Sequence, residues 1–594
     1  MRKGNIGFMR AAGLVSALCI LLAGCSERRG EVAVRIVATT DVHGNIFDKD
    51  LIDGTERDGC LAKFSTFLNR ERKENRNVIY LDAGDVLQGS VEMYHDVTAQ
   101  FERESLAAQA YGLLGCEAVT FGNHEMAAGM TAFEGFRYYA PFPILGVNVC
   151  FDDYGDFLDS YTMIERGGVK VAVLGMTTPV VNYSVPADRK GDLEFRDIVE
   201  TARFAVPILR ERKGADVVVA LVHSGLEGGR MDTEGVFEDE VSMLAAQVPG
   251  INLIIYGHDH EAACLKLAGP DGDSVLVINP GPYAQKAAVA DVKVDFRGSD
   301  SPKVLTSGYL QDITVEEPDK AFMKKLSGWY GDVKAYCDSI VGSVNIALEG
   351  KGALWRGSSA MDYVHSIQLG FQGAEISLTS PVFAGTYIPA GNVTMRDLFK
   401  VYKYDNTMVS VNLRGAEVRD ILEYSTSLYY NTVKTGTDNL LKLRAPDANG
   451  VRMTEIPSNY FITAAGIDYE VDVTKPAGER VRILSMSDGK PFDPDRMYRT
   501  TINSFLYGGT ESALFESGAL KHKDMPVRCN LSSAADIRYF MITRMTSSDD
   551  RRVNVNTFSN WRLVPERLVS ECLAKDTIDF SIIKEQTVKR FKKQ

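Results

Sequence analysis

Apolar runs recur along the first half of the chain, and stretches with a helical pattern separate several of them. Most runs are apolar at successive positions instead of alternate ones, so we expect both faces of each strand to be buried. Buried strands that alternate with helices are typical of layered α/β domains. The pattern predicts such a domain over residues 31–312, with strands at Val32–Thr39, Val78–Leu81, Ala118–Phe121, Val169–Met176, Val217–Val222, Ile251–Tyr256 and Val275–Ile278.

A helical pattern links this domain to the rest of the chain. Within residues 313–341, Phe322, Leu326, Trp329 and Val333 follow one another at intervals near 3.6 residues, which places them on one face of a helix. We expect this helix to lead into a second, α+β domain over residues 342–565, whose turns are marked by stretches rich in Gly, Asp and Asn. Residues 566–594 are expected to form a C-terminal tail.

The first 25 residues have the pattern of an export signal. Basic residues precede an apolar stretch, 11–23, that is too short to span a bilayer. The stretch runs into Leu22-Ala23-Gly24-Cys25, which resembles a bacterial lipobox. The resemblance implies a lipid on Cys25 and an exported protein anchored to the cell envelope, at the outer membrane or in the periplasm. A plain secretory signal with a chance cysteine is the alternative.

Composition narrows the classes of protein and partner. The 594 residues are too many for one hydrophobic core. Lys and Arg number 66 and Asp and Glu 79, a net charge of −13, which argues against a nucleic-acid polymer as partner because such binding needs basic residues. A small anionic substrate is compatible with this charge, since a bound metal attracts phosphate. No segment after residue 25 reaches membrane-spanning length, and we expect a monomer.

The cysteines suggest neither a disulfide scaffold nor a zinc finger. Seven of them follow residue 25, scattered and without a Cys-x-x-Cys pair. An odd number leaves at least one free thiol. Cys116, Cys150 and Cys264 stand in apolar runs, so we expect their thiols to be buried.

Most of the histidines follow the end of a predicted strand. Five of the eight do so, with Asp and Asn side chains beside them. The carboxyl ends of the strands share one rim of a layered α/β domain, where ligands usually bind, so these side chains should converge. Any one of them taken alone is more often a structural residue, but five in such places indicate a site. The candidate residues are Asp41, His43, Asp85, Asn123, His124, His223, His258 and His260.

This mixture of side chains favours a pair of metal ions. Imidazole, carboxylate and amide donors without thiolate suit Zn²⁺, Mn²⁺ and similar divalent ions. Seven or eight donors are too many for one tetrahedral ion and fit two ions that share a carboxylate. Two ions about 4 Å apart can activate water and stabilise an in-line displacement at phosphorus.

The five motifs resemble the sequence blocks of the calcineurin-like metallophosphoesterases, and the second half of the chain resembles the nucleotide-binding domain of the 5′-nucleotidase family. The motifs are Asp41-x-His43, Gly84-Asp85, Gly122-Asn123-His124-Glu125, His223-Ser224-Gly225 and Gly257-His258-x-His260. The resemblance implies a four-layer α/β/β/α fold for residues 31–312. It implies that one ion is held by Asp41, His43 and His260, that the other is held by Asn123, His223 and His258, and that Asp85 bridges them.

The same resemblance gives His124 a part in the reaction. It implies that this imidazole faces the substrate phosphate and stabilises charge or protonates the leaving oxygen. The family often has Asp or Asn three residues later to orient the imidazole, but this chain has Ala127. We expect Glu125 or a group from elsewhere in the chain to take that role.

The second domain is expected to select the substrate. The segment 402–407 resembles the family segment whose aromatic residue stacks on the base, which implies that Tyr404 and Asn406 bind substrate. In the looser match at 503–509, Phe505 or Tyr507 would supply the second ring. The Arg of the Asn-Gly-Gly-Gly-Ile-Arg segment of the 5′-nucleotidases is missing at 380–387, which favours the 2′,3′-cyclic-nucleotide phosphodiesterase/3′-nucleotidase branch. Arg356 is the remaining candidate for an arginine contact.

The residues and the resemblance together predict an enzyme. We expect hydrolysis of nucleotide phosphate esters, either as a 2′,3′-cyclic-nucleotide phosphodiesterase/3′-nucleotidase or as a 5′-nucleotidase, by a hydroxide that two metal ions activate. Two alternatives belong to other classes. One is a surface lipoprotein that binds nucleotides or nucleosides with little catalysis, and the other is an envelope protein whose histidines hold zinc for stability.

Overall fold

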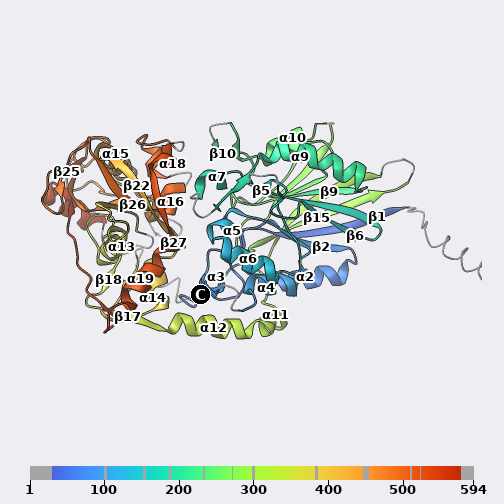
Figure 1. Cartoon of the computed structure of the whole chain (residues 1–594), viewed down its shortest axis with the longest axis horizontal. Helices are drawn as coiled ribbons and strands as arrows, with labels where there is room; N and C mark the ends of the chain where they lie inside the picture. The colour runs from blue at the N-terminus through green and yellow to red at the C-terminus, as the bar shows by residue number, and fades with distance from the viewer. Residues whose placement is uncertain are drawn as a thin grey trace, which may run out of the picture.

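The computed structural model describes residues 30–99, 103–151, 155–185, 190–231, 235–270, 272–297, 302–381, 385–445, 454–508, 512–521 and 524–576. The export signal with Cys25 and the basic end of the chain lie outside the described residues. The described chain forms two lobes, and Figure 1 shows helix α12 (Ser327–Asp338) running along the lower edge between them. In the part of the chain that is described, no helix combines the length and the apolar character needed to cross a membrane.

The first lobe contains two six-stranded sheets. In the first, the order is β16-β15-β1-β2-β3-β4. The strands β1 (Glu31–Thr39), β2 (Val78–Asp82), β3 (Ala118–Thr120) and β4 (Ile144–Leu145) are parallel, and β15 (Lys286–Asp295) and β16 (Lys303–Asp312) join them in antiparallel pairing. Thr39 is paired with Asp82, so β1 and β2 end at the same level.

The second sheet has the order β13-β14-β12-β9-β7-β6. Its four central strands are parallel: β14 (Ser274–Asn279), β12 (Leu253–Tyr256), β9 (Val217–His223) and β7 (Val169–Thr177). The edge strands β13 (Ala263–Ala268) and β6 (Tyr161–Arg166) are antiparallel to their neighbours.

The inner strands are buried on both faces, which explains their continuous apolar runs. On β1, Ile36 packs in the core between the two sheets, whereas Val37 packs under the helices. Helices α2 (Leu61–Glu74) and α4 (Leu106–Leu114) cover the outer face of the first sheet, and α9 (Ile198–Pro207) and α10 (Val241–Gln247) cover that of the second. The predicted α/β/β/α order of layers is confirmed.

The first lobe also has shorter elements around the sheets. They are α3 (Val91–Ala99), α5 (Asn123–Ala127), α6 (Met130–Tyr139), α7 (Val181–Ser184), η1 (Ile208–Arg212), β5 (Val149–Phe151), β8 (Leu193–Phe195), β10 (Gly228–Met231) and β11 (Phe237–Asp239).

The predicted linker helix is present as two helices. These are α11 (Lys320–Lys325) and α12, with a break at Leu326, where φ is −98° and ψ is 9°. Asp319 begins α11 by accepting hydrogen bonds from the backbone N–H groups of Ala321 and Phe322. The four residues predicted to share one face are all buried.

The second lobe is built on a five-stranded sheet in the order β23-β19-β26-β22-β27. Helix α15 packs on it through Ile421 and Leu422, in one core with Val409 and Val411. The main elements are β19 (Ile376–Thr379), β22 (Thr407–Arg414), β23 (Thr463–Ala465), β26 (Met497–Asn503), β27 (Cys529–Asp536), α13 (Ser359–Leu369), α14 (Met395–Val401), α15 (Gly415–Tyr429), α16 (Ser504–Gly508) and α19 (Ile537–Thr546).

Smaller sheets and turns complete this lobe. They are β17 (Ile340–Val344), β18 (Leu348–Glu349), β20 (Tyr387–Ile388), β21 (Gly391–Thr394), β24 (Ile467–Asp472), β25 (Val481–Met486), β28 (Arg552–Val553), β29 (Trp561–Val564), η2 (Ser458–Tyr460), α17 (Ala513–Glu516) and α18 (Met525–Arg528). Residues 566–576, the first part of the predicted tail, are helical, and Val569 and Cys572 are buried in the core of this lobe.

Arg538 ties the two lobes together. Its guanidinium is fully buried, 4.4 Å from the ring centroid of Tyr94 on α3 and 4.0 Å from that of Phe399 on α14. The Tyr94 hydroxyl donates to Asp536 Oδ1 at 3.1 Å. Arg538 also donates to the backbone oxygen of Lys403 at 2.8 Å. This contact therefore connects a helix of the first lobe to the segment that carries Tyr404.

The cysteines follow the predictions with one exception. All seven in the described residues are free thiols, and Cys116 and Cys150 are buried. The expectation that Cys264 is buried was wrong, because this residue is only half-buried. It lies on β13, a strand at the edge of the second sheet in which no residue is fully buried.

His365 is a structural histidine inside the second lobe. The side chain is 3% exposed, and its ring nitrogens lie 2.9 Å from Ser377 Oγ and 3.0 Å from Thr463 Oγ1. Burial opposes the charged form and lowers its pKa to about 3. The unfolded chain, with a pKa of about 6.5, therefore takes up the proton first as the pH falls.

We expect His365 to make the protein less stable in acid. The folded pKa is depressed, so its contribution is complete above the unfolded pKa and is lost as the pH falls toward the folded value. Between pH 7 and 5.5 the loss should be about 1 kcal/mol. Denaturant unfolding of metal-free wild type and His365→Gln at both pH values measures it. A difference between the two proteins that stays constant with pH would contradict this assignment.

Candidate active site

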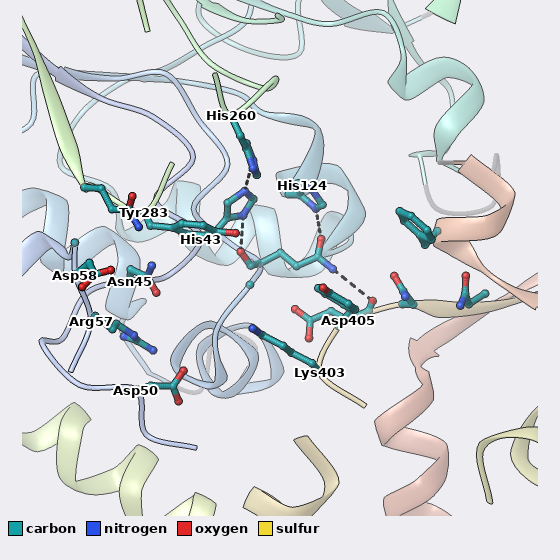
Figure 2. A pocket seen from close by; sticks show the side chains of 18 of the residues that line it. His43, Asn45, Asp50, Arg57, Asp58, His124, His260, Tyr283, Lys403 and Asp405 are labelled. Carbon is teal, nitrogen blue, oxygen red and sulfur yellow. Dashed lines mark hydrogen bonds between the residues drawn. The ribbon is translucent and has the colours of Figure 1, made fainter. Parts of the chain in front are cut away.

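The predicted site residues gather at one rim of the first lobe. They follow the carboxyl ends of β1, β2, β3, β9 and β12, which belong to both sheets. Figure 2 shows His43, His124 and His260 pointing toward a common region at the edge of the cavity between the lobes. The convergence that the sequence predicts is therefore present in the structure.

The backbone turns sharply at most of the candidate metal ligands. Asp41, His43, Asp85, His258 and His260 have φ angles of 48°, 48°, 63°, 85° and 60°, in a region that residues other than glycine seldom adopt. Backbone hydrogen bonds between loops hold two of these turns, from Asp41 N to Gly84 O at 2.9 Å and from His43 N to Asp85 O at 3.0 Å. These turns direct successive polar side chains into one region.

The first group of candidate ligands is Asp41, His43 and His260. The Nε2 atoms of the two histidines lie 3.0 Å apart, and His260 Nε2 is 3.4 Å from Asp41 Oδ1. The Nδ1 atom of His43 lies 2.9 Å from the backbone oxygen of Gln88. That oxygen can only accept, so the proton of the neutral ring is on Nδ1 and the Nε2 lone pair is free for an ion.

The second group is Asn123, His223 and His258. Asn123 Oδ1 lies 3.0 Å from His223 Nε2 and 2.8 Å from His258 Nδ1. The Nδ1 atom of His223 donates to the Ala83 carbonyl at 2.7 Å, so in the neutral ring the lone pair is on Nε2, the atom that faces Asn123 and Asp85. Glu238 Oε1 lies 3.0 Å from His258 Nε2 and orients that ring.

Asp85 lies between the two groups. Its Oδ2 is 3.2 Å from His223 Nε2 and 3.8 Å from His124 Nε2. Asp85 belongs to two groups of side chains that are close enough to share a metal ion. One group adds His43 and His124, and the other adds Asp41 and His223. The nitrogen and oxygen donors lack thiolate, and their lone pairs face one another, so this set fits two divalent ions with Asp85 shared.

The two carboxylates of the site are buried and ionised. Burial opposes the charge of Asp85, but His223 and His124 outweigh it and hold the pKa well below its usual range. For Asp41, burial is outweighed in the same way by a hydrogen bond from His260 and the charge of His223, and the pKa is lowered to about 2. Buried negative charge of this kind calls for cations beside it.

Glu125 is buried and holds the loop after β2 in place. Its carboxylate accepts four backbone hydrogen bonds, from Asp85 N at 2.9 Å, Val86 N at 2.8 Å, Leu87 N at 3.1 Å and Gly122 N at 2.7 Å. The oxygens are thereby engaged in holding the loop after β2. Glu125 is therefore not the partner of the His124 ring, one of the two options that the sequence left open.

His124 lies at the edge of the metal site. Burial, together with repulsion from His43 and His223, lowers its pKa to about 4, against the attraction of Asp85. Its backbone N–H donates to Asp85 Oδ1 at 2.8 Å. Its Nδ1 atom contacts the side-chain oxygen of Gln88. The group that pairs with this ring thus comes from the loop after β2, at a position that no motif in the sequence indicates.

A cavity of about 630 Å³ joins the rim to the second lobe. The lining from the first lobe includes His43, His124, His260, Gln88, Tyr283, Asn45, Asp50, Arg57, Asp58 and Gln285. The lining from the second lobe is Ser380, Lys403, Tyr404, Asp405, Asn406, Tyr460, Asn503 and Phe505. Both lobes therefore contribute to one site.

Three of the five predicted substrate residues line this cavity. They are Tyr404, which is 45% exposed, Asn406 and Phe505. Tyr507 is buried in the core of the second lobe. Arg356 is exposed, and its backbone forms an isolated antiparallel β-bridge with that of Arg562 in β29. The structure does not bring these last two residues to the cavity.

Sequence reasoning missed several of the lining residues. The ring centroids of Tyr460 and Phe505 are 5.7 Å apart at 73°. Lys403 and Arg57 supply cations, although Arg57 is paired with Glu92 at 2.8 Å. In Figure 2 both cations lie below the histidines, with Asp50 close to Arg57. The only feature of the sequence that could have pointed to Lys403 as a cavity residue is its position next to Tyr404.

Comparisons with known proteins agree with this architecture. The chain matches the calcineurin-like phosphoesterase family over residues 34–262 and the 5′-nucleotidase C-terminal domain family over residues 342–517. It is 26% identical to the trifunctional nucleotide phosphoesterase protein YfkN of Bacillus subtilis, over 90% of this chain but only 39% of that protein.

Two further relatives match over most of their length. The chain is 26% identical to the 2′,3′-cyclic-nucleotide 2′-phosphodiesterase/3′-nucleotidase of Haemophilus influenzae, over 91% of this chain and 89% of that protein. A Staphylococcus aureus structure described as a 5′-nucleotidase has the same fold, with a TM-score of 0.69 at 18% identity over 90% of this chain and 100% of that one. The chain therefore belongs to the proteins that join a calcineurin-like phosphoesterase domain to a 5′-nucleotidase C-terminal domain.

Proposed function

We propose that this protein hydrolyses phosphate esters of nucleotides with the help of two divalent metal ions. The observation that carries the proposal is the position of Asp85, a buried carboxylate between two groups of nitrogen and oxygen donors, at the edge of a cavity with aromatic residues on its other side. The chemistry of the donors and the names of the relatives both support a phosphoesterase.

We assign one ion to Asp41, His43 and His260 and the other to Asn123, His223 and His258, with Asp85 shared. When bound, two ions of the Zn²⁺ or Mn²⁺ type would activate water and offset charge at the phosphate. The chain keeps the imidazole lone pairs available, because the carbonyls of Gln88 and Ala83 accept the Nδ1 protons of His43 and His223.

His124 is the residue that we assign to the leaving oxygen. Its ring lies beside Asp85 and lines the cavity, so its Nε2 atom can reach a phosphate bound between the ions and the second lobe. In its doubly protonated form the ring can keep the Nδ1 proton and donate the Nε2 proton, which would neutralise the alkoxide of the departing ribose oxygen and leave His124 as the neutral Nδ1–H ring.

The second lobe provides the site for the nucleoside. Tyr404 and Phe505 are the rings that we assign to base stacking, and Tyr460 supports Phe505 edge-on. Tyr402, which is buried, accepts hydrogen bonds from Asn406 and Asn503 at 3.2 Å and 3.1 Å. These bonds fix two polar side chains of the cavity wall.

The relatives support the branch that cleaves 2′,3′-cyclic nucleotides and 3′-nucleotides. A binding protein with little catalysis is not favoured, because relatives that match over most of their length are named as phosphodiesterases and nucleotidases. We also propose export, with a lipid on Cys25, from the signal-like N-terminal pattern. The monomeric state stays a prediction.

The activity is tested with purified protein that begins after residue 25. We expect release of phosphate and nucleoside, dependent on Mn²⁺ or Zn²⁺, with 2′,3′-cyclic AMP and 3′-AMP cleaved faster than 5′-AMP. Faster cleavage of 5′-AMP would overturn the branch assignment. Tight nucleotide binding with no turnover in either metal would overturn the assignment as an enzyme.

Replacing the shared carboxylate should remove both metal affinity and activity. We expect wild type to bind two ions per chain and Asp85→Asn to lose at least one, with hydrolysis reduced roughly 100-fold or more. Calorimetric metal titration and initial rates measure the two effects. At 100 times the dissociation constant an ion stabilises the fold by about 2.7 kcal/mol, so the increase in Tm on adding metal should shrink as well.

A matched control is Asp362→Asn. This carboxylate is also buried, at 3% exposure, but lies in the second lobe, where burial raises its pKa to about 6. A neutral amide should be tolerated there, with metal binding unchanged. Equal losses in both variants would mean that the effect of Asp85→Asn is general destabilisation.

Removing the stacking rings should lower kcat/KM for nucleotides but not for a substrate without a base. Tyr404→Ala and Phe505→Ala are each expected to lower kcat/KM for 3′-AMP roughly 5- to 150-fold, the equivalent of about 1 to 3 kcal/mol per stacked base. Cleavage of p-nitrophenyl phosphate, which carries no base, should be unchanged. Tyr138→Ala, which removes an exposed tyrosine outside the cavity, is the control. Identical losses on both substrates would argue against stacking.

A further inference from the structure

Gln88 connects three parts of the site. Its backbone oxygen accepts from His43 Nδ1 at 2.9 Å, and its side-chain oxygen contacts His124 Nδ1. Its side-chain nitrogen donates to the backbone oxygen of Asp405, in the second lobe, at 3.4 Å. The dashed lines in Figure 2 that run from His124 toward Asp405 trace the last two contacts.

The contact with Asp405 determines which way the amide points. A backbone oxygen can only accept, so the NH₂ group of Gln88 must face it and the amide oxygen must face His124. This oxygen also can only accept, so the proton of the neutral ring lies on Nδ1 of His124. The Nε2 atom is then the one on the side of Asp85, where it lies 3.8 Å from Oδ2.

No other nearby carboxylate or amide takes this role. Position 127, three residues after His124, is an alanine, which offers the ring neither a carboxylate nor an amide. Glu125 uses its carboxylate for four backbone N–H groups. The single contact of Nδ1 with an acceptor is that with Gln88, among the residues that the structure describes.

We propose that Gln88 is the positioning residue for His124 and that the backbone carbonyl of Asp405 fixes the orientation of its amide. The inference rests on the proposed function, in which His124 serves the leaving oxygen. The second lobe thereby contributes to the chemistry through a backbone atom, in addition to binding the nucleoside. The orientation of the ring depends on both lobes being in contact.

Gln88→Met tests the proposal, because methionine has a similar length but no amide. We expect kcat for 3′-AMP to fall about 10- to 100-fold with KM changed less than about threefold. Cleavage of p-nitrophenyl phosphate should change little, since nitrophenolate leaves without a proton. Metal binding should stay at the wild-type stoichiometry, because the contact with His43 uses the backbone oxygen. An equal loss on both substrates, or loss of a metal ion, would overturn the proposal.

A double-mutant cycle shows whether Gln88 acts through His124. If it does, Gln88→Met added to His124→Ala should lower kcat by less than about twofold beyond His124→Ala alone. Effects that multiply would mean that Gln88 acts by another route. If His124→Ala alone left the cleavage of 3′-AMP unchanged, the failure would lie in the role proposed for His124 and would be visible separately from that of Gln88.

Discussion

The parallel pairing of β1 and β2 continues beyond the point at which the strands end, and the rest of the site depends on it. Ala83 N donates to Thr39 O, Asp41 N to Gly84 O and His43 N to Asp85 O, all within 3.0 Å. These bonds hold the two loops in register while the backbone adopts left-handed conformations that are costly for such residues. Each turn alone would relax, but the ladder of bonds between the loops keeps Asp41 and Asp85 facing each other.

Burying two carboxylates among imidazoles has an electrostatic cost that the protein meets with its own donors and with cations. The backbone N–H of His124 and the imidazole of His223 stabilise the carboxylate of Asp85, whereas the carboxylate of Glu125 accepts hydrogen bonds from the backbone of the loop. The two acidic residues differ in role because they differ in partners. Asp85 faces histidine nitrogens, whereas Glu125 is surrounded by backbone N–H groups.

Much of the first lobe could be predicted because burial on both faces leaves continuous apolar runs, and because polar residues directly after those runs must share a rim. Contacts between distant segments were less accessible. Gln88, Glu238 and Tyr460 reach the site from a loop, a short strand and a short helix, and such short segments have no periodic signal in the sequence. The sequence could not decide between Phe505 and Tyr507, because the answer depends on the helix α16. Residues two positions apart in a helix point about 200° apart, so Phe505 lines the cavity and Tyr507 packs in the core. The position of Cys264 likewise depended on which strand lies at the sheet edge.

The contact between the lobes at Arg538 is linked to how tightly the cavity binds a ligand. The cavity has walls from both lobes, and Arg538, Tyr94 and Asp536 hold those lobes against each other. A molecule that touches both walls adds to the same interface that these three residues maintain, so its binding free energy and the free energy of lobe contact are linked and reciprocal. A substitution at Tyr94, which is not one of the assigned metal ligands, should therefore change the affinity for a ligand. Conversely, a ligand in the cavity should strengthen the contact between the lobes.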